Sequence, residues 1–294
     1  MAYLILSDFK KLIQSDNLSA IIGNDYTILD HVAKGAIEKV KEHLIQKYDC
    51  SKEFTDTIPW VRATAYKGNN RVYLDATAYS AASVYVTNDL CLQAGNVYIS
   101  IGGNAAHTFN ATEWILIGVQ YSMFYVTLPY LEFNSNSVYA KGNQVFWKDK
   151  VYTCVLPTII PSHAGELQVG TYNNLPALNI FPDDSANGVK YWGTGVAYSV
   201  AAGTLPTDST KFTEGDNRNE NIVDGCIDIA LYRVHKRIAP NNVPDLRVKA
   251  YDDCIKWLKD CAVGGFVTLN VPLIQPNQGM RIRWGGEVKR KNNY

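Results

Sequence analysis

The sequence predicts an α+β protein in which a small α-helical bundle, built from both chain ends, is interrupted by an inserted pair of small β-rich modules and followed by an extended C-terminal tail. Three observations predict this class. Apolar residues recur at helical spacing near both ends of the 294-residue chain. Residues 60 to 210 are instead rich in Tyr, Val, Thr, Gly and Asn, and their period is two or unclear. Within this middle part, one short sequence unit occurs twice.

Changes in composition place the boundaries between these parts. We expect the helical domain to comprise residues 1–56 and 216–265, and the two β-rich modules to comprise residues 57–126 and 127–215. Residues 266–294 form the basic tail. The polar stretch LPTDSTKFTEGDNRNEN, which leads into the second helical part, is typical of a return linker.

The N-terminal part is expected to form two helices. Ser7 is a candidate N-cap for a short helix that carries Phe9, Leu12 and Ile13 on one face. A Gly-Asn-Asp turn at residues 23–25 then precedes a longer amphipathic helix. The apolar positions of this longer helix are Leu29, Val32, Ala33, Ala36, Ile37, Val40, Leu44 and Tyr48.

Two more helices are expected after residue 220. The apolar face of the first consists of Val223, Cys226, Ile227, Ala230, Val234 and Ile238, and Pro240 ends it. The apolar face of the second consists of Leu246, Ala250, Cys254, Trp257, Leu258 and Cys261, and Gly264 and Gly265 end it. Four amphipathic helices bury their apolar faces better together than as two separate pairs. We therefore expect the chain ends to pack as one domain, with the two ends of the insertion close together.

The repeated unit lies in the two β-rich modules. Residues 84–98 (VYVTNDLCLQAGNVY) align without a gap with residues 138–152 (VYAKGNQVFWKDKVY), at a constant offset of 54 positions. A tryptophan follows each copy, but the spacing is 16 positions from Tyr98 to Trp114 and 40 positions from Tyr152 to Trp192. We therefore expect an inserted loop in the second copy, with His163, Glu166, Asp183 and Asp184.

Charge and composition argue against several classes of protein. Lys plus Arg and Asp plus Glu number 28 each, so the whole chain has no field that would attract nucleic acid or a membrane. No apolar run approaches the roughly 18 residues needed to cross a bilayer, and we expect a soluble protein. The six cysteines contain no CxxC pair and are expected to be free core thiols, made in a reducing cytoplasm.

The sequence contains no recognisable catalytic, cofactor-binding or metal-binding motif. It has no phosphate-binding glycine loop, HExxH helix or GxSxG elbow, so we expect no enzymatic activity, no cofactor and no metal ion. Glu166 with Asp183 and Asp184 could form a glycosidase pair or a calcium site. Adjacent loop carboxylates are usually only solvated, and these lack the spacing of a calcium-binding loop.

The helical parts resemble a known family. GCIDIALYRVHKRIAP, followed by LRVKAYDDCIKWLKDCAVGG, resembles the closing helix pair of the head-to-tail connector (adaptor) proteins of tailed bacteriophages. LDHVAKGAIEKVKEHLIQKYDC resembles the long second helix of that family, and AYLILSDFKKLI resembles its opening. The resemblance implies a helical bundle that forms a homo-oligomeric ring of about twelve copies beneath the portal protein. It further implies synthesis in the host cytoplasm and a final place in the neck of the virion.

The repeated unit resembles small carbohydrate-binding modules of the chitin-binding type. The order of Tyr139, Gly142, Val145, Val151 and Tyr152 carries this resemblance, together with the later pair Tyr191 and Trp192. Exposed rings could stack on a sugar, so Trp147, Tyr191 and Trp192 are candidate contacts for a glycan or a protein. Trp147 is the best candidate because it precedes a turn and is absent from the first copy. For Tyr98, Tyr152 and Trp114, we expect structural use in a small core rather than sugar stacking.

The tail carries a local charge of +4, from five basic residues and Glu287. Upstream of it, Val267, Leu269, Val271, Leu273 and Ile274 alternate in part like a strand that seeks an edge. We expect the tail to dock on the portal by strand addition or along an acidic groove, rather than to stay solvated. The candidate portal or partner contacts are Arg281, Arg283, Trp284, Lys289, Arg290 and Lys291.

Taken as a sequence, the chain is best interpreted as a structural virion protein. The helices would form the connector ring under the portal, and the β-rich modules would project outward and contact other neck, collar or tail proteins. DNA would pass through the ring without sequence-specific binding. The alternative is a carbohydrate-binding or adhesin module on a helical stalk, and a glycan hydrolase is the weakest interpretation.

Overall fold

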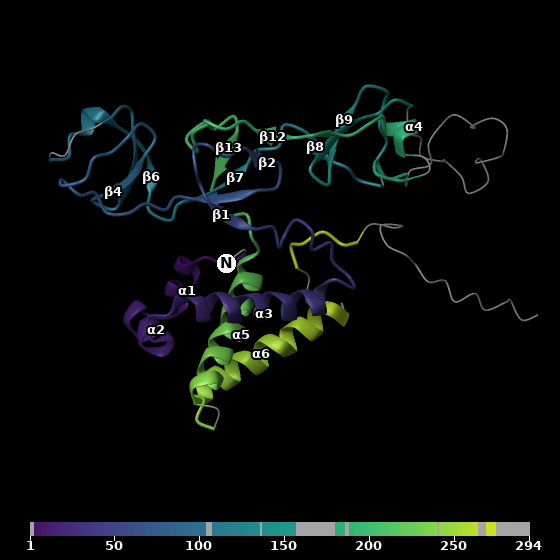
Figure 1. The fold of residues 1–294 in the computed structure, drawn as a ribbon. Coiled ribbons are helices and arrows are strands. Elements are labelled where there is room, and N and C mark those ends of the chain that lie inside the picture. Colours follow the sequence, from purple (N-terminus) through teal and green to yellow (C-terminus); the bar gives the residue numbers. More distant parts are fainter. Residues whose placement is uncertain are drawn as a thin grey trace, which may run out of the picture.

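The helices from the two chain ends pack into one bundle, and the strands form a separate layer beside it (Figure 1). The computed structural model describes residues 3–103, 108–135, 137–156, 180–185, 188–239, 241–263 and 269–274. The bundle contains α1 (Leu6–Leu12), α2 (Ser15–Ile22), α3 (Tyr26–Leu44), α5 (Glu220–Ile238) and α6 (Asp245–Val263). The predicted α+β class, with helical ends around a β insertion, is confirmed.

The α5 helix is the centre of the bundle. It contacts α1, α2, α3 and α6, so side chains on nearly all sides of it are buried. Close packing against α6 depends on Gly225, where a β-carbon would lie 3.0 Å from the sulfur of Cys254. The buried residues of α5 are Ile222, Val223, Gly225, Cys226, Ile227, Ile229, Ala230, Leu231 and Val234. One hydrophobic core therefore joins the N-terminal and C-terminal helices, as expected from their complementary apolar faces.

The first helical segment differs from the expectation. The chain forms two short helices before residue 25, and α1 begins at Leu6, so Ser7 is not its N-cap. The carboxylate of Asp8 instead accepts a hydrogen bond of 2.8 Å from the backbone N–H of Ile5, which satisfies one free donor at the helix start. Gly23, at φ 62°, ends α2 in the left-handed conformation.

The α6 helix buries a narrower face than the sequence pattern predicts. Cys254, Leu258 and Cys261 are buried and Trp257 packs partly buried against the core, but Leu246 is 74% exposed. Residues spaced by four drift around a helix by about 40° per step, so Leu246 lies roughly 120° from Leu258. Two residues so far apart around the helix cannot both lie on one narrow buried face.

The β layer has a central sheet and two flanking sheets. The central sheet has the order β1-β3-β7-β13, in which β1 and β3 are parallel and the other neighbours are antiparallel. Its bounds are β1 (Thr57–Pro59), β3 (Arg71–Tyr73), β7 (Met123–Val126) and β13 (Phe212–Glu214). Beside it, β2 (Tyr66–Lys67) pairs with β12 (Ser199–Val200). These pairs cross the boundary expected at residue 126, so strands from both ends of the insertion share one sheet.

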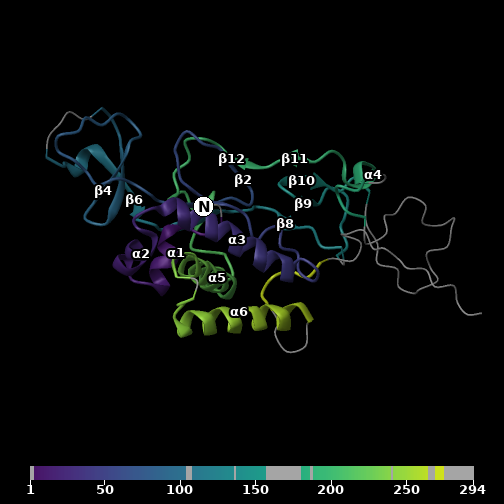
Figure 2. The same ribbon diagram turned by 60° about the horizontal axis from the view of Figure 1, so that its bottom comes forward.

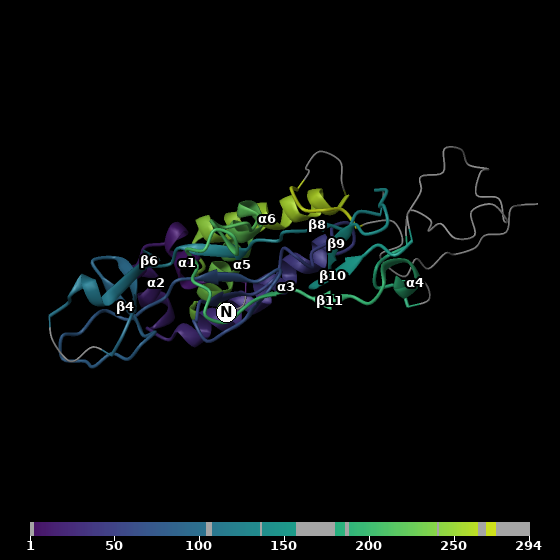
Figure 3. The ribbon, with the colours of Figure 1, turned by 90° about the horizontal axis from the view of Figure 1, so that it is seen from above.

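The two flanking sheets lie at opposite ends of the β layer (Figures 1 and 2). One contains β4 (Leu90–Gln93), β5 (Asn96–Ser100) and β6 (Trp114–Val119), preceded by the short 3-10 helix η1 (Ala111–Glu113). The other contains β8 (Leu131–Glu132), β9 (Gln144–Trp147), β10 (Lys150–Thr153) and β11 (Val196–Ala197), with the short helix α4 (Gly188–Trp192). Seen from above, the sheets and the bundle form an elongated molecule (Figure 3).

A buried ionic network fastens the β layer to the bundle. The guanidinium of Arg218 donates to both carboxylate oxygens of Asp8 at 2.8 Å, to the backbone carbonyl of Tyr3 at 2.7 Å and to Asp216. The side chain of Arg218 is fully buried and that of Asp8 is 1% exposed. Asp216 is thereby held beside the first helix, so the return of the chain into the bundle is fixed.

A second buried arginine connects the β layer to the chain segment that leaves the bundle. Arg71, on β3, donates to the backbone carbonyls of Lys52, Glu53 and Thr55 at 2.9–3.0 Å. The carboxylate of Glu53 accepts from the backbone N–H of Asn219 at 2.9 Å. The two ends of the insertion therefore leave the bundle side by side, as the sequence interpretation required.

All six cysteines are free and buried, which confirms the prediction of core thiols. Burial raises the pKa of the Cys254 thiol to about 12, so this thiol stays protonated and packs as a small apolar group. Within the described ranges, every helix is too short or too polar to span a bilayer.

Candidate functional site

The repeated sequence is also a repeated structure. The β4–β5 hairpin pairs Cys91 with Tyr98, and the β9–β10 hairpin pairs Val145 with Tyr152, each 54 positions later. All four residue pairs of the first hairpin recur in the second with the same register. We call the described residues of 78–119 the first lobe and those of 132–156 and 180–197 the second lobe.

Each hairpin closes with the same turn geometry. Ala94 and Gly95 have φ of 50° and 81°, and Lys148 and Asp149 have φ of 46° and 63°. Two successive residues with positive φ are typical of the turn whose twist matches that of paired strands. The second lobe therefore places Lys148 in a conformation that glycine, asparagine or aspartate adopts more readily, whereas Asp149 suits its position.

A tyrosine and a tryptophan anchor each lobe in the same way. The hydroxyl of Tyr85 accepts a hydrogen bond of 2.8 Å from the N–H of Ser80, and the hydroxyl of Tyr139 accepts one of 2.8 Å from the N–H of Asn134. The ring of Tyr85 meets Trp114 edge to face at 5.1 Å, and the ring of Tyr139 meets Trp192 at 5.0 Å. Trp114 and Tyr152 are 5% and 6% exposed, so both belong to the cores.

The structure supports the expected insertion in the second copy. Equivalent residues of the two hairpins are 54 positions apart. Val97 pairs with Gly118, and its equivalent Val151 pairs with Val196. Gly118 and Val196 are 78 positions apart, so the offset is larger after the hairpins. The difference of 24 residues falls between Thr153 and Trp192. His163 and Glu166 lie outside the described residues, and Asp183 lies inside them.

The expected contact residue Trp147 does not project from its turn. It is 8% exposed, and its ring contacts Phe133 and Phe181. Its indole N–H donates a hydrogen bond of 2.7 Å to Asp183. The segment that returns from the insertion covers the ring, and this is why a residue beside a turn is buried. The expectation of an exposed Trp147 was wrong.

Tyr191 and Trp192 are also core residues. They are 8% and 1% exposed, and the indole N–H of Trp192 donates to the backbone carbonyl of Ile180 at 3.0 Å. Neither ring is free to stack on a sugar or to form a large part of a protein contact. The aromatic residues singled out in the sequence therefore serve the core of the second lobe.

Asp183 is a structural carboxylate. One oxygen accepts from the indole of Trp147, and the other from Lys148 at 2.6 Å. Burial raises its pKa, but the hydrogen bonds from Lys148 and Trp147 and the charge of Lys148 outweigh burial and lower the pKa below its usual value. Asp183 is thus held ionised, whereas a general acid for glycoside cleavage needs a raised pKa.

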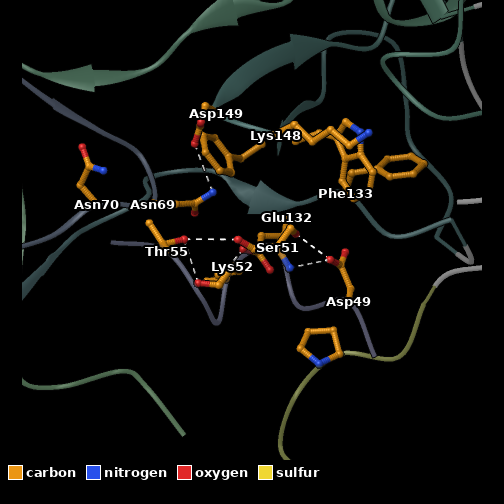
Figure 4. Close-up of a pocket in the computed structure, with 13 residues that line it drawn as sticks. Asp49, Ser51, Lys52, Thr55, Asn69, Asn70, Glu132, Phe133, Lys148 and Asp149 are labelled. Atoms are coloured by element: carbon orange, nitrogen blue, oxygen red, sulfur yellow. Dashed lines mark hydrogen bonds and ion pairs between the residues drawn. The ribbon is translucent and has the colours of Figure 1, made fainter. Parts of the chain in front are cut away.

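A groove separates the second lobe from the bundle (Figure 4). It encloses about 270 Å³, with polar side chains around a floor of buried aromatic rings. Lys52 and Glu132 form an ion pair of 2.6 Å across it, and the amide of Asn69 donates to Asp149 at 3.3 Å. The lining residues are Asp49, Ser51, Lys52, Thr55, Asn69, Asn70, Glu132, Phe133, Phe146, Trp147, Lys148, Asp149 and Pro272.

The groove is lined by hydrogen-bond donors and acceptors. Its ammonium, amide and carboxylate groups could hold a polar segment of a partner protein against the rings of the floor. Among the described residues, no three side chains of the metal-binding types cluster in a way that could hold a metal ion.

The start of the tail is fixed on the bundle beside this groove. Leu269 and Val271 are buried in the helical core, and Leu273 forms an antiparallel bridge with Tyr48. The backbone N–H of Asp49 donates to Pro272 at 2.7 Å, and that of Ile274 donates to Lys47 at 3.0 Å. The alternating residues thus find their strand partner within this chain. Val267 and the candidate contacts Arg281, Arg283, Trp284, Lys289, Arg290 and Lys291 lie outside the described residues.

Two parts of the site could not be read from the sequence. The Arg218 network joins residues 210 or more positions apart, and the groove collects side chains from five separate segments. The absence of Lys and Arg between Arg71 and Lys141 was the one signal of an unusual surface in the first lobe.

A scan against protein-family models found no match, and a search of curated proteins found no similar chain.

Proposed function

We propose that this chain is a structural virion protein that forms the head-to-tail connector, or adaptor, ring beneath the portal of a tailed bacteriophage. The bundle carries the proposal, because α3, α5 and α6 from the two chain ends share one core around an inserted β layer. The resemblance of both helical parts to the connector family implies this arrangement. Such a bundle can repeat around a DNA conduit while the insertion adds bulk on one side only (Figure 1).

The joint between the two layers fits this function. Arg218 and Arg71 hold the β layer to the bundle through buried hydrogen bonds. Arg71 bonds the chain segment that leaves the bundle, and Arg218 lies in the segment that returns to it. Every copy in a ring would therefore present its lobes in the same orientation. We assign the lobes and the groove beside the second lobe to contacts with neighbouring neck, collar or tail proteins.

The basic tail is assigned to the portal. Its start is held on the bundle by Leu269 and Val271, so the following residues leave from a defined point. Five cations alone would bind DNA only weakly and without sequence preference, and the whole chain has no net charge. DNA would pass through the ring without being recognised.

A carbohydrate-binding or adhesin role has less support. That role needs ring faces open to a sugar, and Trp147, Tyr191 and Trp192 are each at most 8% exposed. The resemblance of the lobes to carbohydrate-binding modules is accounted for by the shared hairpin and aromatic core.

Native mass spectrometry of the purified full-length chain tests the proposal, combined with two-dimensional class averages from electron microscopy. We expect closed rings of about twelve copies of the 32.8 kDa chain. A monomer at micromolar concentration would contradict the ring. A monomer that also gave a reproducible signal on a glycan array would favour the carbohydrate-binding role.

A further inference from the structure

The two lobes present equivalent faces at opposite ends of the molecule. The first lobe, with β4 and β6, lies at one end of the β layer, and α4 of the second lobe lies at the other end (Figures 1 and 2). The 3-10 helix η1 corresponds to α4, because they adjoin the equivalent residues Trp114 and Trp192. The chain therefore carries two versions of one unit, set at opposite ends of the molecule.

These equivalent faces differ in charge at matching positions, although the second lobe as a whole has four acids, Glu132, Asp149, Asp183 and Asp184, beside its four lysines. The first lobe contains Asp89 and Glu113 and no Lys or Arg. At the matching positions of the second lobe stand the neutral residues Asn143 and Tyr191. The aspartate-to-asparagine change keeps the local structure, because Asp89 accepts from the N–H of Val86 at 2.7 Å and Asn143 accepts from the N–H of Ala140 at 2.7 Å.

Lysines appear in the second lobe where the first lobe has none. Lys141 and Lys190 are exposed, and their equivalents in the first lobe are Thr87 and Thr112. Neither lysine forms an ion pair within the described part of the chain. Since the aromatic core contacts and the capping hydrogen bonds recur in both lobes, these substitutions are confined to the surface.

Exposed apolar residues accompany the charges in both copies. Val84 is 70% exposed and its equivalent Val138 is 48% exposed. Ile101 is 53% exposed and its equivalent Val155 is 40% exposed. These matching apolar side chains would add apolar area to a contact made by either lobe.

We propose that the first lobe of one copy docks on the second lobe of the next copy. In this contact the acidic face with Asp89 and Glu113 meets the face with Lys141 and Lys190. Two first lobes would oppose acids to acids with no lysine or arginine to offset them, whereas the mixed pair sets these acids against Lys141 and Lys190, so the charges favour the mixed pair over two first lobes. Because the faces lie at opposite ends, each copy engages two neighbours, as a closed ring requires. The inference rests on the proposed ring and names the surface that closes it.

Cysteine cross-linking tests which lobes meet. Thr112→Cys and Lys190→Cys place thiols at equivalent exposed positions, while all six native cysteines are buried. With a short bis-maleimide reagent, a chain that carries both changes should give a ladder of cross-linked oligomers on a denaturing gel. Two singly substituted chains should give dimers when mixed and none when treated separately. Dimers from Thr112→Cys alone would overturn the inference.

The same experiment separates this inference from the proposed function. If native mass spectrometry shows rings but the double variant gives no ladder, the lobe contact is wrong and the ring stands. If the ladder forms but the particles are open chains, the lobe contact stands and the closed ring is wrong. A monomer without a ladder overturns both.

Charge reversal tests the electrostatic part. Lys190→Glu should raise the concentration at half assembly by roughly two- to fivefold at low salt, and Glu113→Lys in the same chain should restore it. The effect should disappear at high salt because exposed charges are screened. Lys150→Glu is the matched control, since this exposed lysine adjoins the turn whose Asp149 faces Asn69 across the groove. A double variant no better than Lys190→Glu would overturn the charge pairing.

Discussion

Replacement of Arg218 by methionine should loosen the joint between the bundle and the β layer. Methionine keeps most of the apolar stem but removes the guanidinium. That group donates to Asp8 and to Tyr3 at 2.7–2.8 Å, and it also bonds Asp216. In the variant, the carboxylate of Asp8 stays buried without its main partner.

The size of the stability loss depends on the interactions that Asp8 retains in the variant. Removal of one partner of a buried ion pair costs about 3–5 kcal/mol. Asp8 still accepts from the N–H of Ile5 at 2.8 Å, and Lys11 lies 3.8 Å away. Asp216 is 30% exposed and can be hydrated. We therefore expect a loss near the lower end, about 3 kcal/mol of unfolding free energy.

Urea unfolding followed by circular dichroism at 222 nm measures this loss. Asp8→Asn in the Arg218→Met background should recover part of it, because no buried carboxylate is then left unpaired. A loss below about 1 kcal/mol for Arg218→Met would refute the reasoning, since that is the range of an exposed pair. A double variant less stable than Arg218→Met would refute it as well.

The pH dependence gives a readout of the other ion pair of Arg218, with Asp216. Burial raises the pKa of Asp216, but the hydrogen bonds and charge of Arg218 outweigh burial and lower the pKa below its usual value. A lowered pKa in the folded state stabilises the protein above the unfolded pKa of about 4, and this stabilisation is lost as the pH falls through the folded value. The stability difference between the wild type and Arg218→Met should therefore shrink as the pH falls below about 4.

Three other perturbations test the remaining architecture. Replacing residues 57–215 by a short Gly/Ser linker from Asp56 to Asp216 should leave a soluble helical protein, because the bundle core draws on the chain ends; an insoluble product by size-exclusion chromatography would count against it. Trp147→Ala should cost about 3–5 kcal/mol in thermal or urea unfolding because the ring is buried, and a variant that melts with the wild type would contradict that placement. Deleting residues 275–294 should leave the bundle folded, since Leu269 to Ile274 remain, and should abolish co-purification with portal protein; portal binding at full strength would exclude the tail as the contact.

Local sequence patterns predicted the elements that bury one face, such as the α3 helix and the two hairpins. Every apolar position named for the longer N-terminal helix is buried, and of these only Tyr48 lies beyond the end of α3. The two hairpins were visible as a repeat because their turns and alternating side chains obey rules that act within a few residues. The predicted face of α6 failed at Leu246, where a four-residue spacing drifted off the contact.

Placement of the aromatic side chains depended on where the chain returns. Trp147 looked like a surface residue because it precedes a turn, and its cover comes from Phe181 and Asp183, more than 30 positions later. No local rule connects these residues, since the segment between them can lead the chain back in many directions. The burial of Trp192 against Ile180 has the same origin.

By itself, the sequence determined the three long helices α3, α5 and α6, the repeated hairpin, the free cysteines and the α+β division of the chain, because each depends on periodicity or composition over short distances. Only the tertiary structure decided that β7 pairs with β13, that Arg218 binds Asp8 and that a groove lies between the second lobe and the bundle. These features join segments separated by tens to hundreds of residues. The buried ion pairs and strand pairs that stabilise these features form only when the two ends of the insertion come together.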